Sequence, residues 1–370
     1  MEFRKRLLVV LMAVSLVVVF DVFANGVRVV TRVAESMVTT SIGPSASLIE
    51  DNAPFLAKEG TLSASAEGIG RVVVRGVEEI FVTASAAPAV TLEYRVRTYA
   101  TSSRRAQEYH QQANVRLVRA GETLEVVFDA PPGGPDLLGF RTSYRMTVPL
   151  GVAVEIDDAT GSASLHGLEG TLTLRRPTGA VTVTEHTGDI RVEESTGYTW
   201  LAGIRGDVHL GHRQGHIELI AVDGEVTVES ERTSVLAETI RGGMTVSVER
   251  GMGIFYSVTG DLTAEASMAH IAANDIGGLL ELRATRSPIE LGPLTGPVRI
   301  ASEGANVRIV LAEADTRRLD VRVERGGIVT DLPFEVLREG RAAILSGSLG
   351  APQGAEVQVR AARGDVLIGW

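Results

Sequence analysis

The sequence predicts an all-β protein whose short strands wind into a two-sheet β-solenoid, and three observations lead to this prediction. A glycine or another small residue recurs every nine residues from Gly161 to Ala305. Apolar residues follow two and four positions after each of these marks, which is the alternation of a strand with one buried face. The seventh position alternates between aliphatic and polar residues, so the complete repeat has eighteen residues and two short strands.

Residues 1–24 have the features of a signal peptide. Basic residues 4–6 precede an uncharged run at residues 7–20, and residues 22–24 (Val-Phe-Ala) satisfy the small-residue rule for signal peptidase. A bilayer-spanning helix needs roughly 20 apolar residues, so the 14-residue run favours a signal peptide. We therefore expect export and cleavage after Ala24. The alternative is a membrane anchor formed by uncleaved residues 7–20, and only in that case do we expect contact with the membrane.

The next two segments are expected to be a linker or N-terminal extension at residues 25–60 and a strand-rich N-terminal cap at residues 61–150. Polar residues at 102–113 predict one short helix in this cap. Runs of β-branched and apolar residues predict its strands at 71–75, 80–83, 91–96, 115–118, 123–128 and 144–148.

Residues 151–312 are expected to form the β-solenoid. The interval from Gly161 to Ala305 holds eight repeats of eighteen residues, and glycine at each strand entrance suits a sharp corner. One corner of each repeat should point inward because it is aliphatic, with His186 as the exception. Two buried ladders are expected, one on each sheet: Ile190, Val208, Val226 and Leu262, and Val181, Ile217, Val235 and Ile271.

Residues 313–370 are expected to form a C-terminal β cap. The nine-residue spacing is lost after Ala312, and the apolar residues near Leu319 and Val366 predict irregular closing strands. Caps at both ends would prevent open sheet edges from joining end to end.

The order of these segments resembles the bacterial putative-adhesin domain family, whose molecular function is unknown. The resemblance rests on "TLEYRVRTYATSSRRAQEYHQQANVRLVRAGETLEVVF", then "YRMTVPLGVAVEIDDATG", and the closing "VQVRAARGDVLIGW". It covers roughly residues 60–370. It implies an exported or membrane-attached β-helical protein at the cell surface or outside the cell. It transfers no functional residue, because it contains no catalytic motif.

Composition excludes several classes of function. The chain has no cysteine, which excludes disulfides, thiol nucleophiles and cysteine-based metal sites. It carries 46 acidic against 36 basic residues, for a net charge of -10. Nucleic-acid binding depends on clustered Lys and Arg, so we expect no nucleic-acid partner.

Two groups of side chains suggest chemistry, and neither predicts a site. His209, His212 and His216 are close in sequence, but the strand pattern points them in different directions, whereas zinc needs convergent ligands. We therefore expect solvated histidines. Asp residues that follow a glycine lack the double glycine of calcium-binding nonapeptide repeats. We expect no metal site, no cofactor and no catalytic residue.

Right-handed β-helices also host carbohydrate-active lyases and hydrolases, so such an enzyme is the alternative function. Asp189, Asp207 and Glu225 lie on the same predicted face as Arg191, in the residue types that such sites use. A charged exposed face is ordinarily only solvated, and no motif adds to this pattern.

One predicted face combines aromatic and apolar side chains. The outward positions of the strands that begin at residues 197, 215, 233 and 251 form a single patch on adjacent coils. Gly253 at an inward position beside Phe255 suggests a local shift of register there. The patch is expected to bind a carbohydrate, a protein or a second copy, unless the 102–113 helix or the C-terminal segment covers it. Its residues are Tyr198, Trp200, His216, Ile220, Leu236, Met252, Ile254 and Tyr256.

These observations together predict a non-enzymatic, exported protein that acts at the cell envelope in surface display, adhesion or recognition of a ligand or partner.

Overall fold

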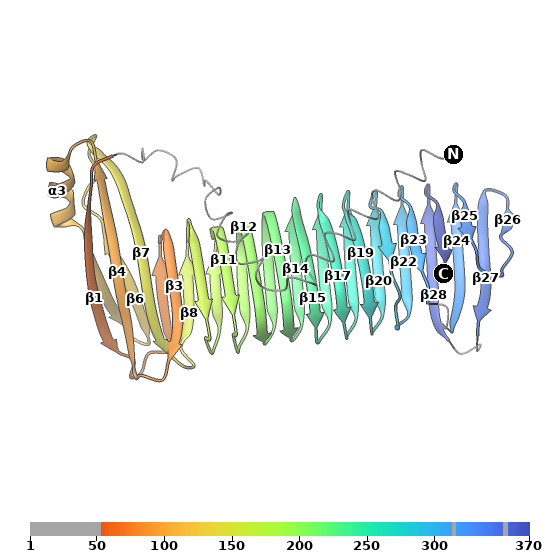
Figure 1. Ribbon diagram of the computed structural model, residues 1–370, viewed down its shortest axis with the longest axis horizontal. Coiled ribbons are helices and arrows are strands. Elements are labelled where there is room, and N and C mark those ends of the chain that lie inside the picture. The colour runs from red at the N-terminus through yellow and green to blue at the C-terminus, as the bar shows by residue number, and fades with distance from the viewer. Residues whose placement is uncertain (1–52, 313–315, 351–353) are drawn as a thin grey trace, which may run out of the picture. The chain divides into compact units, whose positions relative to one another are not determined.

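The computed structural model describes residues 53–312, 316–350 and 354–370. These residues form an all-β structure in which strands β1 to β29 join into one large hydrogen-bonded sheet. Among them the single helix is α3 (Ser103–Gln112), near the N-terminal end of the strand series (Figure 1). The expected signal peptide at residues 1–24 lies outside the described residues, and so does most of the expected linker. Strand β1 begins at Phe55, inside that expected linker.

The N-terminal part is the strand-rich region that the sequence predicts, with one short helix. Strand β4 pairs antiparallel with both β1 and β7, and β5 pairs antiparallel with β6. The side chain of Ser102 caps α3 by accepting a hydrogen bond from the Arg105 backbone N–H. The helix packs against β1, β4 and β7. The strands of this N-terminal part are β1 (Phe55–Ser65), β2 (Arg71–Arg75), β3 (Glu79–Ser85), β4 (Ala89–Ala100), β5 (Asn114–Ala120), β6 (Thr123–Asp129) and β7 (Leu137–Pro149).

The central strands pair in parallel with a constant offset of eighteen residues. Leu172 pairs with Ile190, and Val208 pairs with Val226. The strands are β8 (Ala153–Asp157), β9 (Ser162–His166), β10 (Leu172–Arg175), β11 (Thr178–Thr184), β12 (Ile190–Arg205), β13 (Val208–Asp223), β14 (Val226–Glu231), β15 (Thr233–Ile240), β16 (Met244–Glu249), β17 (Met252–Val258), β18 (Leu262–Ser267), β19 (His270–Ile276), β20 (Leu280–Thr285), β21 (Ile289–Leu291), β22 (Val298–Glu303) and β23 (Val307–Val310).

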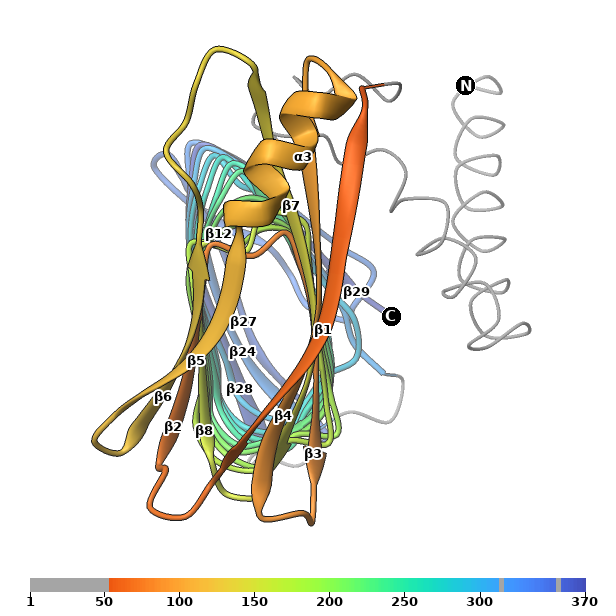
Figure 2. The same ribbon diagram turned by 90° about the vertical axis from the view of Figure 1, so that its left-hand side faces the viewer.

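These strands form two rows, seen end-on in Figure 2. The first row contains β8, β10, β14, β16, β18, β20 and β22, and the second contains β9, β11, β15, β17, β19, β21 and β23. Strands β12 and β13 contribute to both rows, where the sequence predicts two short strands for each. They continue around the corner because Ser195 stays paired with His212 there, with a shift of register.

The side chains between the rows form the core. All eight residues predicted for the two ladders are buried; Val226, for example, is 1% exposed and pairs with both Val208 and Met244. His186 is buried as well, at the corner position that is aliphatic in other repeats. The ladders and the inward corner are therefore confirmed.

Glycine at the corners is required by the close approach of successive coils. Gly206 has a φ of +145°, and a Cβ atom on it would overlap the carbonyl oxygen of Gly188. Gly215 has a φ of +135°, and a Cβ atom there would overlap the carbonyl oxygen of Gly197. L-residues with a side chain rarely adopt these φ values, so both conformation and space select glycine.

The C-terminal strands differ from the irregular closure that the sequence predicts. They pair in full register, but their order in the sheet departs from their order in the chain: β28 lies between β22 and β24, and β29 lies between β23 and β25. The nine-residue spacing is lost because the chain skips one strand position in each row, next to β22 and β23, and later fills these positions with β28 and β29. The strands are β24 (Arg317–Glu324), β25 (Ile328–Thr330), β26 (Leu337–Glu339), β27 (Ala342–Leu349), β28 (Ala355–Ala362) and β29 (Val366–Gly369).

Candidate recognition face

The eight residues predicted for the aromatic patch come together on the second row. They occupy three adjacent lines that cross β12, β13, β15 and β17. The lines are Tyr198, His216, Ser234 and Met252; Trp200, Glu218, Leu236 and Ile254; and Ala202, Ile220, Glu238 and Tyr256. We call the eight predicted residues, together with Glu218 and Glu238, the aromatic patch.

The patch is partly open to solvent. Tyr256 is 41% exposed and Met252 is 36% exposed, and the other members are mostly half-buried. The expected shift of register at Gly253 does not occur, because Val235 pairs with Gly253 and Ala237 with Phe255 in regular sequence. The ring of Phe255 instead fills the space beside Gly253, where a Cβ atom would lie 2.8 Å from its Cζ atom.

Two carboxylates inside the patch were missing from the sequence prediction. Glu218 lies between Trp200 and Leu236, and Glu238 lies between Ile220 and Tyr256. Both occupy outward positions of the same strands, so position alone could have found them. The sequence prediction omitted them because it considered apolar and aromatic residues.

One end of the patch is organised by hydrogen bonding and stacking. The Tyr198 hydroxyl donates to Glu218 Oε2 at 2.7 Å, and the Tyr198 ring stacks on His216 with centroids 5.6 Å apart and planes 1° from parallel. Burial, with the Glu218 hydrogen bond, raises the pKa of Tyr198. Burial lowers the pKa of His216. Both rings are therefore neutral at pH 7, and they present flat, uncharged faces beside a carboxylate.

Trp200, the β12 member of the middle line of the patch, retains an unused donor. Its ring is half-buried between Thr182 and Glu218 in the strand register. Its indole Nε1 is buried and has no hydrogen-bond partner within the described part of the chain. An unsatisfied buried donor is unfavourable, so a shift that brought an acceptor to this nitrogen would be stabilising.

The two segments that were the alternative to an open patch lie against other strands. Helix α3 packs on β1, β4 and β7, and the C-terminal strands β28 and β29 pair with β22 and β23. Neither of these strands pairs with β12, β13, β15 or β17.

The acidic residues that suggested an enzyme hold neighbouring coils together. A carboxylate oxygen of Asp189 accepts from the backbone N–H of Asp207 at 3.1 Å, and Asp207 accepts from Glu225 N–H at 2.9 Å. Glu225 in turn accepts from the N–H of Gly243 at 3.0 Å. Arg191 is hydrogen-bonded to Glu193. These groups satisfy one another and the corner backbone, which is a structural role.

The histidines differ from the solvated group that the sequence predicts. His212 is 4% exposed, and its Nδ1 lies 3.2 Å from the Thr233 hydroxyl. The sequence prediction is wrong for this residue because its ring turns into the corner instead of out to solvent. His209 and His216 are half-buried on opposite rows. The described residues contain no cluster of three or more His, Asp or Glu side chains that could hold a metal ion.

We expect His212 to make the protein less stable in acid. Burial, with a smaller contribution from His216, lowers the pKa of His212 from 6.5 to about 4. The unfolded chain then binds the extra proton first, so stability falls as the pH drops from about 6.5 to about 4, by up to about 3 kcal/mol. Denaturant unfolding across this pH range measures the loss. His212→Asn should reduce the slope, whereas His209→Asn should keep it; equal slopes in all three proteins would contradict the prediction.

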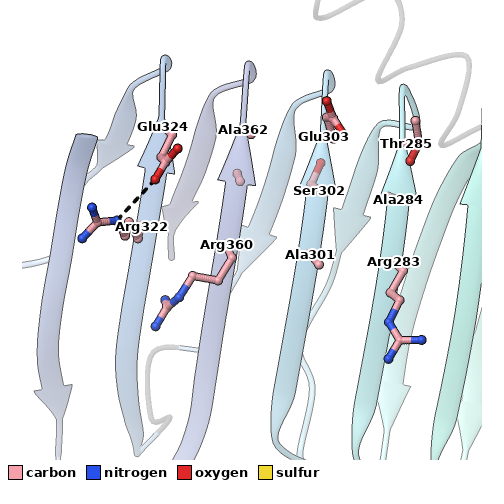
Figure 3. Close-up of a pocket in the computed structure, with 11 residues that line it drawn as sticks. Arg283, Ala284, Thr285, Ala301, Ser302, Glu303, Arg322, Glu324, Arg360 and Ala362 are labelled. Carbon is pink, nitrogen blue, oxygen red and sulfur yellow. Dashed lines mark ion pairs between the residues drawn. The ribbon is translucent and has the colours of Figure 1, made fainter. Parts of the chain in front are cut away.

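A shallow hollow of about 380 Å³ lies on the first row near the C-terminal strands (Figure 3). Small side chains such as Ala301 form its floor, and Arg283, Arg322 and Arg360 border it. These cations already have acidic partners: Arg360 bonds Asp320 at 3.1 Å, and Arg283 bonds Glu281 at 2.9 Å. An anion would have to compete with these carboxylates, so the hollow is a weaker candidate than the aromatic patch.

Among the described residues, no helix has the length and apolar character required to cross a membrane.

The chain is similar to solved structures of bacterial proteins. No family model matches the chain, and no curated protein matches it. A solved putative adhesin from Parabacteroides merdae is 11% identical, with 84% of this chain and 96% of that chain covered and a TM-score of 0.39. A putative adhesin from Parabacteroides distasonis is 13% identical, with coverages of 86% and 98% and a TM-score of 0.22. A putative cell adhesion protein from Clostridium sporogenes is 10% identical, with coverages of 85% and 99% and a TM-score of 0.20. These three solved structures are described as putative adhesins or as a putative cell adhesion protein. The sequence resembles the bacterial putative adhesins as well.

Proposed function

We propose that this chain is a non-enzymatic β-solenoid, exported from a bacterial cell, that recognises a partner at the cell envelope in adhesion or surface display. One observation carries the proposal: the aromatic patch is contiguous across four adjacent strands and partly exposed. Contiguous apolar and aromatic surface of this kind is typical of interaction sites.

The domain organisation that accompanies this function is also a proposal. We propose a signal peptide at 1–24, a linker at 25–54, an N-terminal cap at 55–150, the β-solenoid at 151–312 and a C-terminal cap at 313–370. The cap begins before the expected residue 61 because β1, which starts at Phe55, pairs with β4. The constant offset of eighteen residues between parallel strands supports the solenoid. The long antiparallel strands β4 and β7 support a separate N-terminal cap.

The side chains of the patch suit a carbohydrate. Flat aromatic faces at Trp200 and Tyr256 offer apolar surface to a sugar ring, and aromatic side chains with a polar atom can also form hydrogen bonds. The carboxylates of Glu218 and Glu238 can accept hydrogen bonds from sugar hydroxyl groups. A protein or a second copy of the chain would use the same apolar residues, so self-association is measured beside polysaccharide binding.

We expect Trp200→Ala combined with Tyr256→Ala to remove binding and leave stability nearly unchanged. Removing two aromatic side chains from opposite edges of the patch weakens binding by at least about tenfold. Binding of the purified protein to an array of bacterial polysaccharides measures the effect, with light scattering to detect self-association. Thermal unfolding is measured in parallel, because Trp200 is only half-exposed.

Phe81→Ala is the matched control. Phe81 is an aromatic residue that is 40% exposed on β3, outside the patch. The control should bind as the unaltered protein does. A large loss of thermal stability in the double variant would instead show that the two rings are internal packing, and the proposed recognition face would then be wrong.

A further inference from the structure

The C-terminal strands complete the sheet by insertion. In the first row the order of bonded strands is β20, β22, β28, β24 and β27, and in the second row it is β21, β23, β29 and β25 (Figure 1). Strands β28 and β29 are the last two in the chain, yet they lie between strands formed by earlier residues. They therefore occupy a slot with a strand edge on either side.

The slot is specific in register and in burial. Val357 pairs with Val298 on one side and with Leu319 on the other. In the second row, Val366 pairs with Val307 and with Ile328. The inserted apolar side chains Val357, Val359, Val366 and Ile368 are all at most 2% exposed. Without the insert, two strand edges in each row and their apolar side chains would lose their partners.

The route of the chain places the inserted strands after both strands that flank them. Strand β23 ends at Val310 and β24 begins at Arg317. Between β22 and β24, and likewise between β23 and β25, the chain skips one strand position. The chain then runs back along the far side of β24 as β27, whose last residue, Leu349, pairs with Arg317. Ala355 at the start of β28 pairs with Arg317 from the opposite side. Only residues 350–354 connect β27 to β28, so the two segments pass on opposite sides of one strand.

We propose that this slot is a strand-acceptor site that takes residues 355–369 from a second copy of the chain as well as from its own. A second copy presents the identical sequence, so it satisfies every paired backbone group and every buried side chain that the slot requires. A short connection between exchanging elements favours exchange between copies, because it restrains the insert within its own chain. The acceptor edges belong to β22 and β24 in the first row and to β23 and β25 in the second.

A cysteine pair across the slot reports which copy supplies the insert. The natural chain has no cysteine, so introduced cysteines have no competing partner. Arg299 on β22 and Gln358 on β28 are directly paired, and we replace both, as Arg299→Cys with Gln358→Cys. A disulfide within one chain gives a monomer on a non-reducing gel, and a disulfide between exchanged copies gives a covalent dimer. The protein is refolded from denaturant at increasing concentration and then oxidised.

We expect the ratio of covalent dimer to monomer to rise with concentration. A tenfold increase in chain concentration should raise it about tenfold while dimers are the minor species, by mass action. Glu281→Cys with Arg299→Cys is the matched control, because these residues lie on consecutive strands β20 and β22 that need no insertion. The control should give monomers at every concentration. Equal dimer formation in the control would overturn the proposal, since the contact would then be nonspecific.

A second cysteine pair tests the proposal if the first variant fails to fold. Val329 on β25 and Leu367 on β29 are directly paired and are 62% and 41% exposed, so Val329→Cys with Leu367→Cys disturbs no buried side chain. It should give the same dimers as the first pair. Extra Gly and Ser residues inserted between Gly350 and Gly354 should lower the dimer ratio in both, because a longer connection relieves the restraint. Monomers alone from both cysteine pairs at all concentrations, or a ratio insensitive to the longer connection, would overturn the proposal.

Discussion

Replacing Val226 with Asp is expected to lower the free energy of unfolding by about 4 kcal/mol or more, because it buries a carboxylate that has no partner. Val226 is 1% exposed and pairs with Val208 and Met244, so its side chain faces apolar ladders on both sides. Urea or thermal unfolding of the chain without residues 1–24 measures the loss. At this magnitude, a substantial share of the protein's stability is expected to disappear.

Thr227→Asp is the control for this substitution. Thr227 is the next residue on β14, and its half-exposed side chain lies on the other face of the strand. The same change in charge should there be nearly silent. If Val226→Asp left the unfolding midpoint unchanged, the assignment of Val226 to the buried ladder would be wrong.

Replacing Gly215 with Ala should also be strongly destabilising. Its φ of +135° is rarely open to a residue with a side chain, and a methyl group there would overlap the carbonyl oxygen of Gly197. Strained backbone alone costs on the order of 1–3 kcal/mol, and the steric overlap adds to it, so we expect a loss of about 3 kcal/mol or more. The loss is measured by denaturant unfolding.

Gly76→Ala separates the two contributions. Gly76 has a φ of +62°, and a Cβ atom there would meet nothing within 4 Å. This variant should show only the conformational part, about 1 kcal/mol. If Gly215→Ala cost no more than Gly76→Ala, the close approach of successive coils would not be what selects glycine at the corners.

The sequence predicts the central fold well because each coil repeats the same local solution. Alternating apolar positions and corner glycines recur with a fixed period, so residues such as Val226 and Ile240 could be placed inside from spacing alone. The C-terminal order could not be predicted in this way. Strand β28 pairs with residues 59 positions earlier on one side and about 38 positions earlier on the other, and no local period encodes such pairings.

The candidate site was predictable in position and less so in chemistry. Strand period placed Tyr198, Trp200 and Tyr256 on one face, and the register of the strands agrees with that placement. Side-chain conformation decided the rest. The hydrogen bond from Tyr198 to Glu218 and the inward turn of His212 depend on side-chain rotamers, which spacing does not determine.

The eighteen-residue offset also sets the loop-closure entropy that is lost when each coil is added to the stack. Closing a loop of this length costs about 2.6 kcal/mol beyond a constant, and every central coil incurs the same amount however many coils precede it. The pairing of Val298 with Val357 closes a loop of 59 residues, which adds only about 1 kcal/mol because the cost grows as the logarithm of length. Burying the four aliphatic side chains of β28 and β29 contributes about 6 kcal/mol or more. This burial outweighs the additional cost of loop closure, so breaking the order of the coils at the C-terminus costs little at equilibrium. We expect its main consequence to be for the rate at which the last coil forms.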